Sequence, residues 1–148
     1  MYSINSNTGQ LESLSPATIA TENTPLGITL SPDGNYAYVA NFGDSTISMY
    51  SRSESGLLSK LSPESIATGS HPIGITISPD GKYAYVTNYV SNNVSMYSRN
   101  RTNGQLAPLS PATIATENTP TGITISPDGN YTYVTNFNSD TISIYFIK

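Results

Sequence analysis

One motif occurs three times along this 148-residue chain at nearly constant spacing. Residues 25–29 read PLGIT, and the motif returns as PIGIT from Pro72 and as PTGIT from Pro120, after steps of 47 and 48 residues. A period of roughly 40 to 50 residues is typical of one blade of a β-propeller. We therefore expect three successive copies of one unit, at about residues 25–68, 72–116 and 120–148.

Each copy contains four short runs typical of strands, separated by turn residues. In the first copy these runs are residues 27–30, 36–40, 46–50 and about 65–68. The first two are joined by Ser-Pro-Asp-Gly, in which Pro presets φ and Gly accepts a positive φ, as a tight turn requires. No run has helical periodicity. The sequence predicts an all-β fold in which a single domain, residues 1–148, contains three four-stranded antiparallel blades.

The pattern PxGIT(I/L)SPDGxYxYV(T/A)N resembles the YVTN repeat of the lactonase-type β-propeller family, which includes YncE-like and 6-phosphogluconolactonase-like proteins. The pattern GQLxxLSPATIAT, within residues 1–21 and again within 96–116, is similar to the blade junctions of that family. The resemblance covers the whole chain, and it implies a ring of seven blades and hydrolysis of a sugar lactone. Its matching residues are turn and packing positions, so it specifies the fold more strongly than the function.

The chain contains fewer blades than this family implies, and its ends are offset. Met1 and Tyr2 match the end of a third strand at Met96 and Tyr97, residues 17–21 match a fourth strand, and the chain finishes on a third strand. Propellers typically have about 4 to 8 blades, so three blades leave both ends of the arc open. We expect a head-to-tail homo-oligomer, preferably six blades from two chains, in which residues 17–21 complete the third blade of a neighbour. The alternative is a fragment of a longer seven-bladed propeller.

Composition argues against several classes of function. The net charge of −4, with only six Lys and Arg residues, disfavours nucleic acid as a partner. No segment has the apolar length of a membrane span or the layout of a signal peptide, so no membrane partner is expected. With no cysteine there is no thiolate or zinc-thiolate site, and the cellular compartment is left undetermined. No metal or cofactor is predicted.

Charged residues divide between the two ends of the predicted blades. The loops from the fourth strand to the next first strand, and from the second to the third, share one end, here called the top end. This end has no Lys or Arg in its loops, and an acidic surface attracts cations. The sequence therefore predicts a non-catalytic propeller that binds a ligand or protein there, such as a cationic small molecule or a basic peptide. The candidate ligand-binding residues are Glu22, Asp44, His71, Glu117 and Asp140.

The alternative function is a lactonase-like hydrolase of the 6-phosphogluconolactonase type, as the resemblance implies. Lactone hydrolysis needs a general base, and a phosphorylated substrate also needs cations. His71, the only histidine, is the candidate catalytic base, although the other two copies have Thr24 and Thr119 at its position. The aspartates of the three Ser-Pro-Asp-Gly turns are interpreted as structural. Because one histidine supports no confident nucleophilic triad and the top end lacks cations, the residues themselves leave the enzymatic alternative open.

Overall fold

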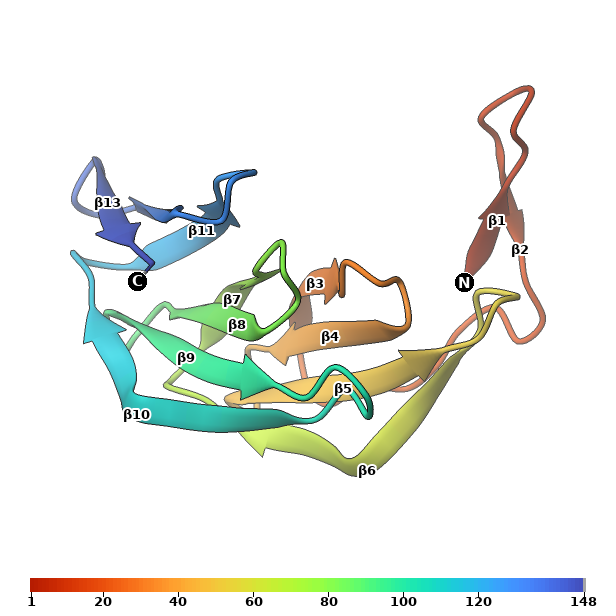
Figure 1. Ribbon diagram of the computed structural model, residues 1–148, viewed down its shortest axis with the longest axis horizontal. Helices are drawn as coiled ribbons and strands as arrows, with labels where there is room; N and C mark the ends of the chain where they lie inside the picture. Colours follow the sequence, from red (N-terminus) through yellow and green to blue (C-terminus); the bar gives the residue numbers. More distant parts are fainter. Residues whose placement is uncertain (148) are drawn as a thin grey trace.

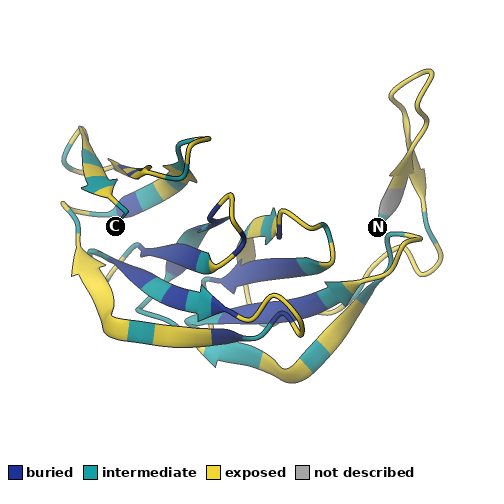
Figure 2. Ribbon diagram, viewed as in Figure 1, coloured by how far each residue is buried: buried dark blue, intermediate teal, exposed yellow. Residues whose placement is uncertain are grey.

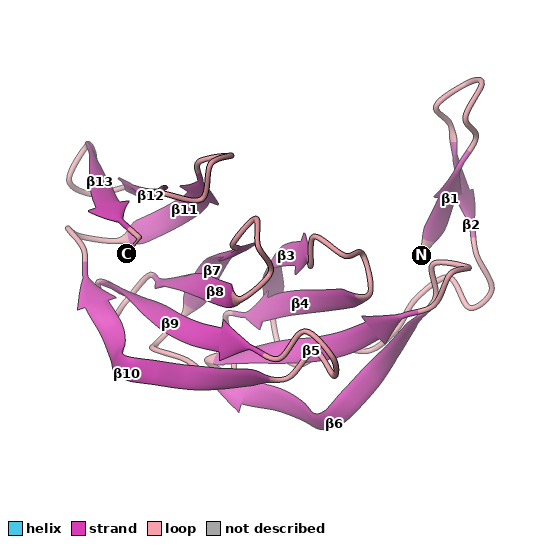
Figure 3. Ribbon diagram, viewed as in Figure 1, coloured by secondary structure: helices cyan, strands magenta, loops and turns pink. Residues whose placement is uncertain are grey.

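The computed structural model describes residues 1–147, and this part of the chain contains strands and turns but no helix (Figure 3). No described segment forms a helix long and apolar enough to cross a membrane. The strands form two four-stranded sheets, one three-stranded sheet and one two-stranded hairpin, all antiparallel. Their bounds are β1 Tyr2–Ile4, β2 Leu11–Ser13, β3 Pro25–Leu30, β4 Tyr36–Asn41, β5 Thr46–Arg52, β6 Leu58–Ala67, β7 Pro72–Ile77, β8 Tyr83–Asn88, β9 Asn93–Arg99, β10 Leu106–Ala115, β11 Pro120–Ile125, β12 Tyr131–Asn136 and β13 Thr141–Phe146.

The Ser-Pro-Asp-Gly turn links the first two strands of each blade, as predicted. In the first blade the Gly34 amide donates to the Ser31 carbonyl at 2.8 Å, and the Asn35 amide donates to the Asp33 carboxylate at 2.9 Å. Gly34 has φ of 71°, a conformation that costs glycine little. The aspartate therefore caps its own turn, and this confirms the structural interpretation of that residue.

The fourth strand of the first two blades is longer than the sequence suggested. β6 begins at Leu58 and β10 at Leu106, well before the expected start of these strands. Each pairs with its neighbour in two stretches separated by a register shift, which falls between Pro108 and Thr113 in β10. Because proline has no N–H to donate, the Ser-Pro sequence at this point interrupts the ladder and has the composition of a turn, although the strand continues beyond it.

The first and second blades pack face to face through one buried apolar cluster. Tyr38, Ile47 and Met49 of the first blade lie against Ile75 and Ile77 of the second, and each is at most 8% exposed. Figure 2 shows the buried residues concentrated in the strands of these two central sheets. Burial of such side chains contributes roughly 1.5–3 kcal/mol each, so this interface holds the first two blades together.

The inner strands β3, β7 and β11 follow one another along the inside of the arc (Figure 1). Here backbone approaches backbone: a Cβ on Gly74 would lie 2.5 Å from the Thr121 carbonyl oxygen, and one on Gly27 would collide with the Ile73 carbonyl. Glycine is required at these two positions because no larger residue fits.

The two ends of the arc are incomplete in complementary ways. The third blade contains only β11, β12 and β13, whereas the N-terminal hairpin β1–β2 stands apart from the three sheets. Figure 1 shows this hairpin and β13 at opposite ends of an open arc. Residues 17–21, expected to form a fourth strand, pair with no strand among the described residues. Completion of the third blade by another chain stays a prediction.

Candidate functional site

The top-end loops interlock from blade to blade. The His71 amide, at the entry to the second blade, donates to Ser45 Oγ of the first blade at 3.3 Å. At the next junction the Thr119 amide donates to Asn92 Oδ1 at 2.8 Å. These contacts place the predicted loops at one common end of the sheets. The candidate site is therefore a rim that spans three blades.

Glu22 and Asp44 lie at the top end of the first blade, and both carboxylates are held by neighbours. Glu22 accepts hydrogen bonds from the Thr46 hydroxyl and, at 3.5 Å, from Asn41 Nδ2. Asp44 accepts from both the backbone and the side-chain nitrogen of Asn23, at 2.8 and 2.9 Å. The two bonds from Asn23 lower the pKa of Asp44, so this exposed carboxylate is ionised at neutral pH.

His71 lies in the seam between the first two blades. Its Nδ1 is 2.7 Å from Ser70 Oγ, and its ring meets Phe42 edge-on with a centroid separation of 4.5 Å. The ring of Tyr89, from the second blade, also lies near Phe42, with a centroid separation of 6.3 Å. Within the described residues, Nε2 of His71 makes no hydrogen bond. The contact with Ser70 thus holds one of the two ring nitrogens.

Glu117 and Asp140 belong to the third blade, and both are exposed. Asp140 has a positive φ of 52°. Ser45 and Asn92, at the matching loop positions, also have positive φ, of 56° and 51°. Among residues 1–147, no group of three acidic or histidine side chains lies close enough to hold a metal ion. The five predicted residues therefore share one end of the molecule, but the structure does not gather them into a single pocket.

Three asparagines beneath this rim were not among the predicted site residues. Asn41, Asn88 and Asn136 are at most 2% exposed, and each Nδ2 donates to two side chains of the neighbouring strand. Their recurrence at the end of every second strand was the signal that could have identified them. In Asn88 the Oδ1 atom accepts from Thr68, whereas Oδ1 of the other two is buried without a partner among the described residues. These asparagines fix the start of each top-end loop.

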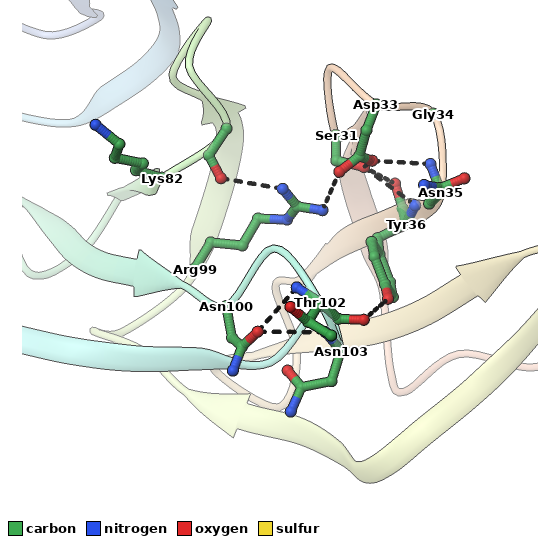
Figure 4. Close-up of polar contacts among 12 residues, drawn as sticks. Ser31, Asp33, Gly34, Asn35, Tyr36, Lys82, Arg99, Asn100, Thr102 and Asn103 are labelled. Atoms are coloured by element: carbon green, nitrogen blue, oxygen red, sulfur yellow. Dashed lines mark hydrogen bonds and ion pairs between the residues drawn. The ribbon is translucent and has the colours of Figure 1, made fainter.

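At the opposite, bottom end three cations, Lys60, Lys82 and Arg99, make ion pairs. Arg99 is fully buried and donates to the Gly81 carbonyl at 3.0 Å and to Asp33 at 2.9 Å (Figure 4). Lys60 pairs with Glu64, and Lys82 pairs with Asp80. The six top-end loops contain no Lys or Arg, so the top end of this chain offers carboxylates and an imidazole but no cation.

The repeated antiparallel sheets, packed face to face along an arc, define the class: this is a β-propeller. The family model of the seven-bladed β-propeller lactonases matches residues 1–113, and the chain belongs to this family. Among the curated proteins there is no match to this sequence.

Solved structures have the same fold. A candidate 6-phosphogluconolactonase from Bacteroides fragilis is 24% identical over 99% of the chain, with a TM-score of 0.85. One from Bacteroides uniformis is 25% identical over 99% of the chain, with a TM-score of 0.83. The periplasmic gluconolactonase of Pseudomonas aeruginosa is 20% identical over 97% of the chain, with a TM-score of 0.67. The chain covers 44%, 43% and 48% of these proteins, so it spans less than half the length of each.

Proposed function

We propose that this chain contributes the substrate-binding end of a sugar-lactone hydrolase. The observation that carries the proposal is membership of the lactonase family over residues 1–113, a range that contains both His71 and Asp44. These residues belong to loops that touch, because Phe42, two residues before Asp44, packs edge-on against the His71 ring. A base and an ionised carboxylate thus lie at adjacent top-end loops.

In the proposed reaction His71 acts as the general base. The bond between Nδ1 and Ser70 orients the ring, and Nε2 takes a proton from a water molecule. The water oxygen attacks the carbonyl carbon of the lactone, the ring C–O bond breaks, and the proton passes to the departing ring oxygen. One lactone and one water give one hydroxy acid, with no cofactor required by the balance.

The charge of the top end favours an unphosphorylated substrate. Phosphate recognition relies on Arg, Lys or clustered backbone N–H donors, and the six loops supply neither Arg nor Lys. Glu22, Asp44, Glu117 and Asp140 repel a phosphate instead. We therefore infer that a neutral sugar lactone binds better here than 6-phosphogluconolactone.

A second candidate function is non-catalytic binding of a cationic small molecule or a basic peptide at the same end. It is favoured by the exposure of Asp44, Glu117 and Asp140, which leaves carboxylates open to an incoming cation. In this case His71 serves as a packing residue of the seam between the first two blades.

Turnover measurements distinguish the two functions. The purified protein is assayed with glucono-δ-lactone and with 6-phosphogluconolactone, after subtraction of spontaneous hydrolysis. We expect turnover of the neutral lactone, and a loss of about 10²–10⁴-fold in kcat for His71→Ala, the usual contribution of a general base. Thr119→Ala, at the matching position of the third blade, is the control and should retain activity.

The opposite result has a defined meaning. Absence of turnover for both lactones, together with saturable binding of an oligolysine peptide that Glu117→Gln and Asp140→Asn weaken, would replace the hydrolase by the binding function.

A further inference from the structure

The open ends of the arc expose the two halves of one buried interface. In the contact between the first and second blades, Ile75 and Ile77 of the second blade are each 8% exposed. The matching residues of the first blade, Ile28 and Leu30, are 65% and 52% exposed, because no other sheet packs on them among the described residues. The N-terminal end therefore presents an apolar surface that fits the face by which one blade contacts the next.

The C-terminal end presents the other half. Ile47 and Met49 of the first blade are fully buried against the second. Their counterparts in the third blade, Ile142 and Ile144 of the edge strand β13, are 60% and 64% exposed. Contiguous apolar side chains on an unpaired edge strand are a site for association with another chain.

We propose that a second copy of this chain binds here, so that its first blade packs on the third blade and its residues 11–20 pair with β13. The partner is identified by contacts that the chain already makes within itself. Tyr97 Oη donates to the Ala67 carbonyl of the preceding fourth strand at 2.7 Å, and Tyr50 Oη donates to the Ala20 carbonyl at 2.9 Å. Residues 17–20 thus already lie against the first blade as the fourth strand of a preceding blade would.

The repeat fixes the register of the proposed pairing. In the first blade Ala67 lies opposite Thr46 and Ile66 opposite Ile47. In the second blade the equivalent Ile114 lies opposite Val94. By the same offset, Ile19 of the second copy lies opposite Ile142, and Ala20 lies opposite Thr141. β13 then gains the fourth strand that the third blade lacks.

In the proposed dimer, an open apolar groove between the second and third blades accommodates the turn between β1 and β2 of the second copy. The groove is lined by Tyr83, Tyr85, Met96, Leu109 and Phe146 among others. The equivalent space between the first two blades is filled by the turn after β9.

In that filled space Tyr36 Oη donates to the Thr102 carbonyl at 2.6 Å, and Tyr38 Oη donates to the Gly104 carbonyl at 2.8 Å. Residues 7 and 9 are the counterparts of Thr102 and Gly104, and Gly9 has φ of 71° where Gly104 has 75°. The turn of the second copy therefore has the backbone conformation needed to receive the Tyr83 and Tyr85 hydroxyls.

Charged groups at the two ends match in the same way. Arg52 repeats the contact of Arg99 with its own turn, since its Nη1 donates to the Gly34 carbonyl at 3.3 Å. Arg99 also pairs with Asp33 of the preceding blade, whereas Arg52 has no ion pair among the described residues. Asp128 of the third blade of a second copy occupies that position, so the interface gains an Arg52–Asp128 ion pair.

One segment must move for this interface to form. β1 pairs with β2 in the register that β9 has with β10: Tyr2 lies opposite Ser13 as Tyr97 lies opposite Pro108. Residues 144–147 of another copy have the same place in the repeat as residues 1–4. β13 of one copy therefore takes the place of β1 beside β2 of the other copy. The same strand exchange occurs at both contacts between the two chains. Two chains of three blades close a ring of six, within the usual range of about 4 to 8.

The first experiment measures mass and register together. The protein has no cysteine, so Ile19→Cys and Ile142→Cys introduce a defined pair. We expect light scattering to give twice the 15.8 kDa chain mass, and mild oxidation of the double variant to give a covalent dimer. The control pair Ile19→Cys with Ile144→Cys, displaced by two residues, should cross-link poorly. A mass of 15.8 kDa at the highest attainable concentration, or equal cross-linking of both pairs, would overturn the proposal.

A second variant tests strand displacement without new side chains. Deletion of residues 1–4 removes the strand that competes with β13, so the dimer dissociation constant should fall. Deletion of residues 1–20 should abolish the dimer. Unchanged or weaker association after the short deletion would contradict the exchange. Both readouts are independent of lactone turnover, so failure of the proposed activity leaves this test intact.

Discussion

The Asp33 carboxylate of the first blade accepts a hydrogen bond from Nη2 of Arg99 in the second blade at 2.9 Å, and the Arg99 side chain is fully buried. The guanidinium also donates through Nε to Tyr38 Oη at 2.8 Å and lies 5.0 Å from the centre of the Tyr36 ring. One buried cation thus connects two blades whose contacting residues are 66 positions apart in the sequence.

We predict that Asp33→Asn lowers the free energy of unfolding by about 2 kcal/mol more than Asp80→Asn, because it leaves a buried cation without its anion. Asp80 caps the same type of turn but pairs with Lys82, whose side chain is 55% exposed, and such pairs contribute about 0–1 kcal/mol. Urea unfolding of both variants measures the difference. Equal losses would mean that the turn cap, common to both, is the whole contribution.

Acid should weaken the same junction. Burial acts to raise the pKa of Asp33, but hydrogen bonds from Ser31, the Asn35 amide and Arg99 outweigh it and hold the pKa at about 2, below the usual 3.8. Because the pKa is lower in the folded chain, the stabilisation is complete above about pH 4 and is lost as the pH falls towards 2. Unfolding free energies measured across this range should decline less steeply for Asp33→Asn. A parallel decline would assign the acid sensitivity to other carboxylates.

Two glycines should respond differently to the same substitution. Gly74→Ala should destabilise the chain, since its Cβ would lie 2.5 Å from the Thr121 carbonyl oxygen. Gly122 belongs to the inner strand of the third blade, and a Cβ there would meet only Thr135 Oγ1, at 3.0 Å. We therefore expect Gly122→Ala to destabilise the isolated chain less than Gly74→Ala does while weakening self-association, measured by thermal unfolding and light scattering. Identical effects of the two substitutions on unfolding would contradict this difference.

If the top end binds a lactone, its charge should select among substrates. Glu117→Lys adds a cation at an exposed top-end position and should lower the KM for 6-phosphogluconolactone relative to glucono-δ-lactone. Glu54→Lys makes the same change of charge in an exposed loop at the bottom end and is the matched control. A similar shift in both variants would indicate an effect of net charge, with no role for the top end.

Much of the fold was predictable because the repeat is local. The Ser-Pro-Asp-Gly turns, the positions of the first three strands and the grouping of the acidic loops all follow from residues close together in the sequence. The buried state of Arg99 was not predictable, because its surrounding segment, Tyr-Ser-Arg-Asn-Arg, has the polarity of an exposed loop. Only contact with the preceding blade removes that side chain from water.

The sequence predicts at which end of the blades the candidate site lies, but it does not predict which of its side chains touch. The loop positions of Glu22, Asp44 and His71 follow from strand alternation. The contact between Phe42 and His71 depends on how closely two blades approach, which no sequence spacing reveals.

The backbone contacts at Gly27 and Gly74 have a consequence for assemblies built from this repeat. At the inner edge the blades meet through main-chain atoms, so their separation there is already at its minimum. A side chain at either position would spread the inner edges while the outer hairpins kept their spacing, and the arc would straighten. The curvature of the assembly, and with it the number of blades needed to complete a circle, is therefore controlled by a missing methyl group.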